Sequence, residues 1–321
     1  MSAPVVVVLG SFMMDLVVRA PRRPRPGETV IGTGFEMFLG GKGFNQAVAA
    51  ARAGASTAMI GCLGSDDFGE RFVAQLGADG IDTTHVRRDP HVGTGIGLPL
   101  VEDSGENSIV VIPQANHCLR PEHVEAAGDT IAGASVLLLQ FELPFDTVCA
   151  AASIAHEAGL TVICNPAPAR PDIAALDGLV DIFVPNRSEA AALTGSDDGE
   201  EAEELARRLE ARTGATTVLT LGAAGALVLD GRGPRRVDAH RVAVVDTVGA
   251  GDAFCGTLAA RLARGEPLPE AVRRANAAGA LAVTRPGAEP SMPTHEAVSA
   301  LLASGDGAPD VDPATSEGLR A

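Results

Sequence analysis

The stretch Asp246–Phe254 reads DTVGAGDAF and places two glycines and an alanine directly before an aspartate. Apolar residues after it recur at helical spacing, through Leu258 and Leu262, so a helix is predicted to begin here. Gly249–Gly251 would form its first turn, where backbone N–H groups lack helical partners and attract anions. Asp252 could be a simple helix cap. The glycines favour instead an anion-binding turn with a base beside it, because a cap needs none of them and a phosphate can approach a bare backbone.

A second glycine-rich stretch, GGKGFNQAVAAARAGA at Gly40–Ala55, also precedes a predicted helix. It lacks the GxxxxGK[ST] spacing of a Walker A loop, so it does not indicate a P-loop nucleotidase. Lys42 is the only lysine among 25 basic residues. In a chain that otherwise uses arginine, a lysine is favoured where a compact ammonium fits and a planar guanidinium does not. Lys42 is therefore a candidate site residue, a partner in a structural ion pair or a chance surface residue. Asn45 is either a helix cap or a ligand-binding amide.

The overall charge limits the classes of partner. The 321 residues carry a formal net charge of −16, which disfavours nucleic acid and anionic membranes as partners. A small phosphorylated ligand is compatible with it, since backbone amides bind phosphate without net positive charge. The five cysteines are scattered with no CxxC pair, which indicates reduced thiols in a cytoplasmic protein. The first apolar run, VVVVL, is too short for a signal peptide or a membrane span and is typical of a buried strand.

Apolar runs of strand length alternate with helical patterns along most of the chain. This alternation predicts an α/β fold with a mainly parallel central sheet and helices on both faces. The predicted strands are Val5–Leu9, Thr57–Ile60, Val136–Gln140, Thr161–Asn165, Ile182–Pro185, Thr217–Leu221 and Ala226–Leu229, and HRVAVVDTVG (240–249) reads as a further strand leading into a loop. The other predicted helices are Gly43–Ala53, Gly69–Asp79, Pro121–Ile131, Phe145–Ala158, Ser188–Thr194, Glu200–Thr213 and Leu268–Arg285.

Two segments lack this alternation of strands and helices, residues 15–38 and residues 91–113. Both are rich in glycine and proline and show short alternating strands without a helical pattern. Together they are predicted to form a small separate β-sheet, a lid over one edge of the main domain, which would span residues 1–303. The tail at 304–321 lacks apolar periodicity and is predicted to be disordered.

Seven stretches in the same order resemble the ribokinase-like, or pfkB, sugar kinases. They are GSFMMDLV with PGETV, GGKGFNQAVAAARAGA, QFELP, NPAPAR, PNRSEAAALTG, TLGAAG and DTVGAGDAFCGTLAA, and with AVTRPGAEPS the resemblance extends from about Val5 to Ser291. NPAPAR and AVTRPGAEPS resemble the ribokinase branch in particular. The resemblance implies ATP-dependent phosphorylation of a sugar hydroxymethyl group, most directly that of D-ribose.

By this resemblance Asp252 is the general base that takes the proton of the sugar hydroxyl. The amides of Gly249, Ala250 and Gly251 would stabilise charge on the transferred phosphoryl group. The implied sugar-binding residues are Met13, Asp15, Gly41, Lys42, Gly43, Asn45, Glu142 and Asp252. The implied ATP-binding residues are Asn186, Thr220, Gly222, Gly225, Gly251 and Asn276. For Thr220, Gly222, Gly225 and Asn276 the alternative is an ordinary turn or helix residue.

The resemblance also implies two kinds of metal ion. Glu189, three residues after Asn186, would act on Mg²⁺ through water, because Mg²⁺ tends to keep its hydration shell. Helix capping is the alternative for both residues. A potassium (K⁺) site, built largely from backbone carbonyls and an aspartate, would take Asp246, Val248, Ala282, Arg285, Gly287 and Ser291, with an ordinary buried loop as the alternative.

Some alternatives stay open at this point. Met13, Phe44 and Gln114 depart from the pattern of some relatives near the predicted sugar site or lid, so a nucleoside or another furanose or keto-sugar is an alternative acceptor. A regulator that binds sugar or nucleotide without catalysis would be expected to have a damaged Asp252 or glycine turn, and neither is damaged. A nicotinamide dehydrogenase needs GxGxxG at the first helix, whereas the first strand here runs into GSFMMD. An uncovered strand edge on the lid predicts a homodimer through it.

Overall fold

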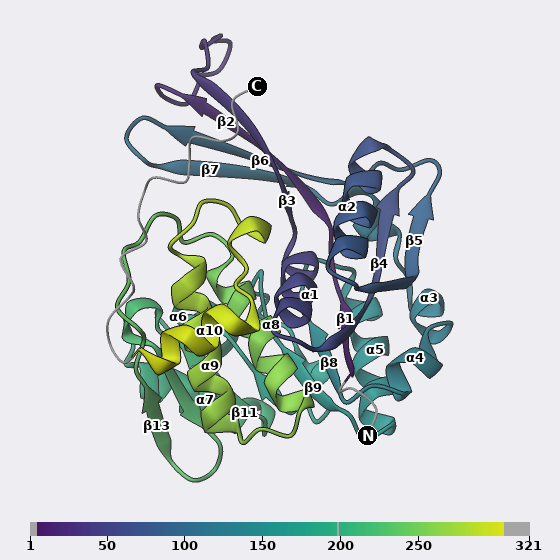
Figure 1. The fold of residues 1–321 in the computed structure, drawn as a ribbon, viewed down its shortest axis with the longest axis vertical. Helices are drawn as coiled ribbons and strands as arrows, with labels where there is room; N and C mark the ends of the chain where they lie inside the picture. Colours follow the sequence, from purple (N-terminus) through teal and green to yellow (C-terminus); the bar gives the residue numbers. More distant parts are fainter. Residues whose placement is uncertain (1–4, 198, 305–321) are drawn as a thin grey trace.

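A computed structural model describes residues 5–197 and 199–304, and within them the largest element is a nine-stranded sheet (Figure 1). In order across the sheet its strands are β13 (Pro234–Val237), β12 (Ala226–Leu229), β11 (Thr216–Thr220), β10 (Ile182–Phe183), β9 (Thr161–Cys164), β8 (Val136–Leu139), β1 (Val5–Leu9), β4 (Ser56–Gly64) and β5 (Asp82–Asp89). The strands from β11 to β5 run parallel, and β12 and β13 pair antiparallel at one edge. The mainly parallel sheet is thus confirmed.

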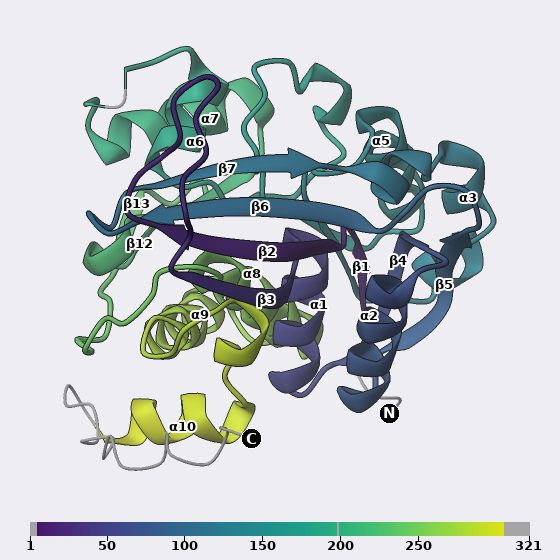
Figure 2. The ribbon, with the colours of Figure 1, turned by 90° about the horizontal axis from the view of Figure 1, so that it is seen from above.

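Helices cover both faces of this sheet. They are α1 (Lys42–Arg52), α2 (Asp67–Ala78), α3 (Pro121–Glu125), α4 (Gly128–Ala132), α5 (Phe145–Glu157), α6 (Arg187–Thr194), α7 (Ala202–Thr213), α8 (Ala250–Ala263), α9 (Leu268–Ala282) and α10 (His295–Ala303). Figure 2 shows α5, α6 and α7 on one side and α1, α8 and α9 on the other. None of the helices in the described ranges is long and apolar enough to cross a membrane.

The central strand β1 shows why its sequence is apolar at every position. Val6 and Val8 belong to the cluster that includes the side chains of α1, α8 and α9. Val7 and Leu9 point the other way and belong to the cluster that includes α5. Successive side chains of a strand alternate between its faces, so a strand with helices on both faces needs an unbroken apolar run.

The lid is a second, four-stranded sheet within the described residues, with strand order β3–β2–β6–β7. Its strands are β2 (Met13–Ala20), β3 (Gly34–Gly40), β6 (Gly95–Glu102) and β7 (Asn107–Ile112). The pairs β2–β3 and β6–β7 are antiparallel hairpins, and β2 joins them by pairing parallel with β6. Figure 1 shows this sheet standing apart from the large one.

The segment HRVAVVDTVG at 240–249 is not a strand, which corrects the prediction made from its alternating valines. It pairs with no strand, and its backbone amides at Val245 and Asp246 donate instead to the carbonyl oxygen of Val283 after α9. Val244, Val245 and Val248 are all more than half exposed. The alternating valines of this segment therefore do not reflect the burial of one face of a strand.

Other differences lie at the ends and edges of elements. The helix predicted over Pro121–Ile131 is divided into α3 and α4, and the one predicted to reach Arg285 ends at Ala282. The edge strands β5 and β13 and the helix α10 were not predicted; DTTHVRRD and PRRV are polar because an edge strand has less surface to bury. The predicted disordered tail lies outside the described residues except for Ser304.

Candidate active site

The anion-binding turn predicted at Gly249–Gly251 opens α8 in the structure. Gly249 occupies the capping position with a φ of 79°, a left-handed conformation that favours glycine. A Cβ on Gly249 would also lie 3.0 Å from the Cα of Ala288. Asp252 stands inside the first turn, so it is not the cap of this helix.

Asp252 is only 7% exposed, and two side-chain amides of α1 hold its carboxylate. Asn45 Nδ2 donates to Oδ2 and Gln46 Nε2 donates to Oδ1, each over 2.9 Å. Burial raises the pKa of Asp252, and the negative charge of Glu142 adds to this, while Lys42 and the two amides oppose it. The carboxylate is thus buried and held in one orientation by two hydrogen bonds.

Lys42 stands at the start of α1 among three acids. Burial acts to lower the pKa of its ammonium, but the charges of Asp252, Glu142 and Glu189 outweigh burial and raise that pKa. The side chain therefore stays protonated between the predicted sugar residues and the predicted nucleotide residues. Lys42 is therefore not an exposed surface lysine, and structural pairing with these acids stays the alternative to a role at the sugar.

The glycines of GGKG allow α1 to lie against the loop that follows β1. Gly41 has a φ of 94°, and a Cβ there would lie 2.8 Å from the backbone nitrogen of Met13. A Cβ on Gly43 would lie 2.5 Å from the nitrogen of Ser11. This close approach brings the amide of Lys42 to the carboxylate of Glu142, with N–H donating to Oε2 over 2.9 Å.

Asp15 and Glu142, both predicted to bind the sugar, are acids that interact with each other. Ser11 Oγ donates a hydrogen bond to Glu142 Oε2, and Asp15 lies on the lid strand β2. A Cβ on either Gly40 or Gly97 would overlap the Asp15 carboxylate. The neighbouring strands β3 and β6 leave room for this carboxylate because these two residues are glycines. Burial, assisted by the charge of Glu142, raises the pKa of Asp15 to about 7.

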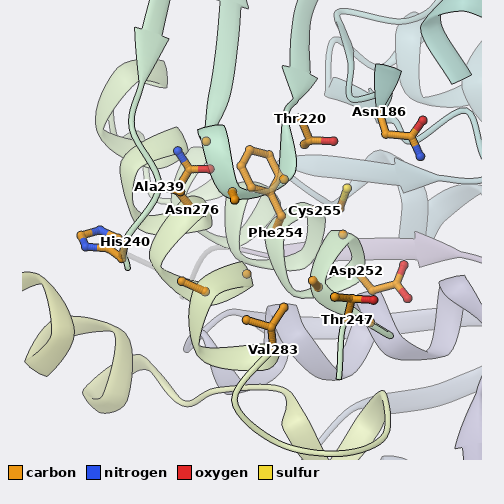
Figure 3. A pocket seen from close by; sticks show the side chains of 18 of the residues that line it. Asn186, Thr220, Ala239, His240, Thr247, Asp252, Phe254, Cys255, Asn276 and Val283 are labelled. Atoms are coloured by element: carbon orange, nitrogen blue, oxygen red, sulfur yellow. The ribbon is translucent and has the colours of Figure 1, made fainter. Parts of the chain in front are cut away.

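A cavity of about 700 Å³ has Asp252 in its wall (Figure 3). Ligand sites for small molecules commonly have volumes of ~300–1,000 Å³. Figure 3 shows Asn186, Thr220, Asn276 and Asp252 arranged around it from separate elements. The predicted residues that line the cavity are Lys42, Asn186, Glu189, Thr220, Gly222, Gly225, Gly249, Ala250, Gly251, Asp252 and Asn276. Those expected only at the sugar (Met13, Asp15, Gly41, Gly43, Asn45 and Glu142) are not part of its wall.

Asn186 and Glu189 both cap α6 and face this cavity. The Asn186 side chain accepts from the amide of Glu189, and the Glu189 side chain accepts from the amide of Asn186, each over 2.8 Å. The capping alternative is therefore correct as far as it goes. Burial raises the pKa of Glu189, and the Asn186 amide and Lys42 oppose that shift.

Turn glycines and Asn276 shape the far end of the cavity. Gly225 has a φ of 85°, and a Cβ there would lie 2.7 Å from the nitrogen of Ala239. Asn276 Nδ2 donates to the carbonyl oxygen of Val237 over 2.9 Å, which ties α9 to the end of β13. Thr220 Oγ1 donates to the carbonyl oxygen of Pro185 over 3.2 Å.

The residues predicted for a monovalent cation come together only in part. The carboxylate of Asp246 accepts from the amides of Val248 (3.0 Å) and Gly287 (2.9 Å), so the two segments meet at this residue. Ser291 Oγ donates to the carbonyl oxygen of Ala288, Ala282 ends α9, and Arg285 is exposed. No group of three or more His, Cys, Asp or Glu side chains able to hold a metal occurs in the described ranges. A cation here would depend on backbone carbonyls.

Sequence reasoning missed several polar residues of the site. Ser11, Gln46, Gln140 and Asn165 are all buried, and each contacts either Glu142, Asp252 or another member of this group. The signal for Gln46 was present, since it follows Asn45 in the turn after the glycines. Phe44, expected near the sugar, packs instead in the core with its ring centroid 4.8 Å from that of Phe72.

Residues 4–295 match the model of the pfkB family carbohydrate kinases. The chain belongs to this family. It is 40% identical to the ribokinase of Haemophilus influenzae over 291 residues, covering 90% of this chain and 95% of that protein. It is 34% identical to the deoxyribokinase of Salmonella typhimurium over 300 residues, covering 92% and 98%. The structure of Arabidopsis thaliana ribokinase complexed with ribose and ATP superposes with a TM-score of 0.88 at 30% identity, covering 94% of this chain and 99% of that one.

Membership of this family makes the chain a carbohydrate kinase and confirms the resemblance seen in its seven motifs. The fold is also that of solved ribokinases, with the large sheet and the separate lid. A dehydrogenase and a binding protein without catalysis are therefore no longer alternatives.

The raised pKa of Asp15 predicts how stability depends on pH. An acid with a folded pKa above its unfolded one favours folding at low pH, and this contribution is lost as the pH rises to the folded value. The Asp15→Asn variant lacks this loss because it is neutral at every pH. The melting temperature of the variant minus that of the wild type should increase between about pH 4 and pH 7 and level off above. A difference independent of pH would contradict the burial of an ionisable Asp15.

Proposed function

We propose that this carbohydrate kinase transfers the γ-phosphoryl group of ATP to the hydroxymethyl group of D-ribose, giving D-ribose 5-phosphate and ADP. The observation that carries the proposal is the position of Asp252. Its buried carboxylate lies in the first turn of α8, directly after the glycine turn, accepts hydrogen bonds from two side-chain amides of α1 and lines the 700 Å³ cavity. Similarity to the Haemophilus influenzae ribokinase and to the Arabidopsis thaliana ribokinase bound to ribose and ATP supports the substrates.

In the proposed reaction, Asp252 accepts the proton of the sugar hydroxyl as its oxygen attacks the γ-phosphorus. A new O–P bond forms, the bond from the γ-phosphorus to the bridging oxygen breaks, and ADP leaves with that electron pair. The amides of Gly249, Ala250 and Gly251 would stabilise the charge that develops on the phosphoryl group. The base and the anion-binding turn both belong to the start of α8, so their relative positions are fixed. This suits phosphoryl transfer, which is catalysed mostly by positioning.

For the sugar, we propose the group Met13, Asp15, Gly41, Lys42, Gly43, Asn45 and Glu142, with Asp252. Carboxylates and amides suit the hydroxyl groups of a pentose, since they offer strong acceptors and donors. Asn45 Oδ1 is buried and has no hydrogen-bond partner among the described residues. A sugar hydroxyl would satisfy this atom, whose burial otherwise costs stability.

For the nucleotide, we propose Asn186, Thr220, Gly222, Gly225, Gly251 and Asn276, which line the cavity. Mg²⁺ is commonly held by one or two carboxylates together with substrate phosphates, and it neutralises phosphate charge. The chain fits this use, because Glu189 lines the cavity at the start of α6 and can offer its carboxylate to the metal's water shell. We also propose a cytoplasmic location, which the five free thiols of the described chain support.

Deoxyribose is the second candidate acceptor, and Met13 is the observation that favours it. Met13 is 4% exposed at the base of the lid, and its thioether is a weak acceptor that cannot donate to a sugar hydroxyl. The similarity to the Salmonella typhimurium deoxyribokinase is spread over nearly the whole chain. A nucleoside or keto-sugar stays a further alternative within the same family.

An acceptor screen tests the proposed function directly. Release of ADP would be measured with ribose, deoxyribose, fructose, ketodeoxygluconate and nucleosides at equal concentrations. Ribose is expected to give the highest kcat/KM. A higher value for deoxyribose would establish the second candidate, and activity with nucleosides alone would reject both pentoses.

Replacement of the proposed base is expected to stop chemistry and spare nucleotide binding. Asp252→Asn keeps the shape and burial of the side chain but cannot accept the proton, so kcat should fall about 10³-fold. ATP affinity, measured by calorimetry, should change little because the cavity wall is preserved. A variant that kept a tenth of wild-type turnover would show that Asp252 is not the base.

We propose further that K⁺ raises activity by ordering the segment from Asp246 to Val248 ahead of the anion-binding turn. The contact of Asp246 with the Gly287 amide supports this, because it joins that segment to the loop after α9. We assign Ala282, Arg285 and Ser291 to the same site, through their backbone carbonyls. A large, weakly hydrated cation suits carbonyl ligands.

Activity in different salts tests the cation. At constant ionic strength, the rate in potassium chloride should exceed the rate in sodium chloride. Asp246→Asn should reduce this difference while leaving the acceptor preference unchanged. Equal rates in the two salts would contradict the site.

We propose a homodimer formed through the lid. Its strands expose an unusual number of large apolar side chains, among them Phe35 at 60%, Ile109 at 57% and Val110 at 60%. Such an exposed apolar sheet is typical of an interaction surface. The edge strand β7 also offers unpaired backbone groups to a second copy.

Light scattering at micromolar concentration should give twice the 32.6 kDa mass of the chain. Phe35→Glu should shift this mass toward the monomer, because an ionised carboxylate is costly to bury in an apolar interface. Val244→Glu, at a residue that is 64% exposed and is not part of a lid strand, serves as the control and should remain dimeric. A monomeric wild type would contradict the proposal.

A further inference from the structure

Gln46 lies on α1 where this helix meets α8, and it has no solvent exposure. Its Nε2 donates to Asp252 Oδ1 over 2.9 Å and to Asn165 Oδ1 over 3.1 Å. Its Oε1 accepts from Gln140 Nε2 over 2.6 Å. All the hydrogen-bonding groups of this buried side chain are thus used, and one of them contacts the proposed base.

The orientation of the Gln46 side-chain amide is determined by the backbone carbonyl of Val184, which acts through Asn165. Asn165 Nδ2 donates to the carbonyl oxygen of Val184 over 2.8 Å, and that carbonyl can only accept. Asn165 must therefore present Oδ1 to Gln46, so Gln46 must present Nε2. Its Oε1 then faces Gln140, which has to donate. Reversing any of these amides would place two acceptors or two donors against each other.

This network decides which atom meets Asp252. Because the network turns Nε2 of Gln46 toward Asp252, Gln46 donates to Oδ1 of the carboxylate. Asn45, the preceding residue of α1, donates to Oδ2. The carboxylate plane is fixed by two donors from consecutive residues. In a buried site, a carboxylate without such donors would rotate or take up a proton.

The charged and titratable groups around Asp252 come from four elements. They are Lys42 at the start of α1, Glu142 after β8, Glu189 on α6 and the buried thiol of Cys255 on α8 itself. Glu142 and Glu189 disfavour an ionised Asp252, whereas Lys42 favours it. Gln46 is one of two uncharged donors that add to the effect of Lys42.

We propose that Gln46 is a positioning residue for phosphoryl transfer: its amide, locked by Gln140 and Asn165, holds Oδ1 of Asp252 so that the carboxylate faces the acceptor hydroxyl. This inference rests on the proposed function, in which Asp252 is the general base. Gln46 does not touch the sugar or the nucleotide in this role. It acts through the orientation and the ionisation of Asp252.

Two substitutions separate this role from simple packing. Gln46→Met keeps the length of the side chain and removes the donor, and Gln46→Glu keeps the shape and puts an oxygen where Nε2 was. Each should lower kcat by roughly 10-fold to 100-fold, because small misplacements of a reacting group have effects of this size. The KM for ATP should change little, since Gln46 is not part of the cavity wall.

The pH profile of kcat/KM gives the decisive readout. Its acidic limb should move to higher pH in Gln46→Met, because a donor that favours the ionised base is lost. It should move further in Gln46→Glu, because a second carboxylate adds its charge. A purely structural role would lower the melting temperature and leave this limb in place.

Gln75 provides a matched control elsewhere in the chain. It lies on α2, and its Nε2 donates to the carboxylate of Asp79 over 2.8 Å, the same pairing as that of Gln46 with Asp252. Gln75→Met and Gln75→Glu should leave kcat and the pH profile at wild-type values. If both Gln46 variants fail to fold, Gln140→Met becomes the test, since it removes only the lock on Oε1. It should lower kcat by about 10-fold, and a wild-type kcat would overturn the inference.

Combining Gln46→Met with Asp252→Asn tells the two hypotheses apart. If Gln46 acts through Asp252, its substitution should cause almost no further loss once the base is gone. A loss of activity in Asp252→Asn together with wild-type kcat and pH profile in folded Gln46 variants would overturn the role of Gln46 alone. Retained turnover in Asp252→Asn would instead overturn the base itself.

Discussion

The close approach of α1 to α8 is the constraint on which the site depends. The two helices meet at Gly256, where a Cβ would lie 2.6 Å from the Cβ of Ala49 and 2.8 Å from the nitrogen of Ala50. Small residues on both helices let the backbones come close, so that Asn45 and Gln46 reach Asp252 across the contact. A larger residue at Gly256 would push against the backbone of Gln46 and Ala50, the part of α1 that carries the two amides.

The parallel sheet explains why polar groups gather at this contact. In such sheets the carboxyl ends of the strands open onto one edge, and ligands bind there. Ser11 follows β1, Gln140 and Glu142 follow β8, and Asn165 follows β9. Neighbouring strands therefore deliver these side chains to one place, although they are far apart in sequence. The glycine-led starts of α1 and α8 face the same edge, and the site is assembled from strand ends and helix starts.

Much of this arrangement could be predicted from local sequence, and the failures share a physical cause. The glycine turn before Asp252 and the buried strand β1 are local patterns, and both were predicted correctly. The strand expected at 240–249 was wrong because alternating valines do not show whether a partner strand exists. The contact of Gln46 with Asp252, 206 residues away, could not be derived from spacing, and only the position of Gln46 directly after Asn45 pointed to it. The mutual capping of Asn186 and Glu189, by contrast, could be seen in their spacing.

The proposed site takes residues from both sheets. Met13 and Asp15 belong to the lid strand β2, which is built into the small sheet through its pairing with β3 and β6. Asp252 and its amides belong to helices packed on the large sheet. The glycines that make room for Asp15, at positions 40 and 97, are also lid residues. We therefore expect substitutions at Met13 and Asp15 to change the acceptor preference while the proposed base, its amides and the predicted anion-binding turn keep their positions.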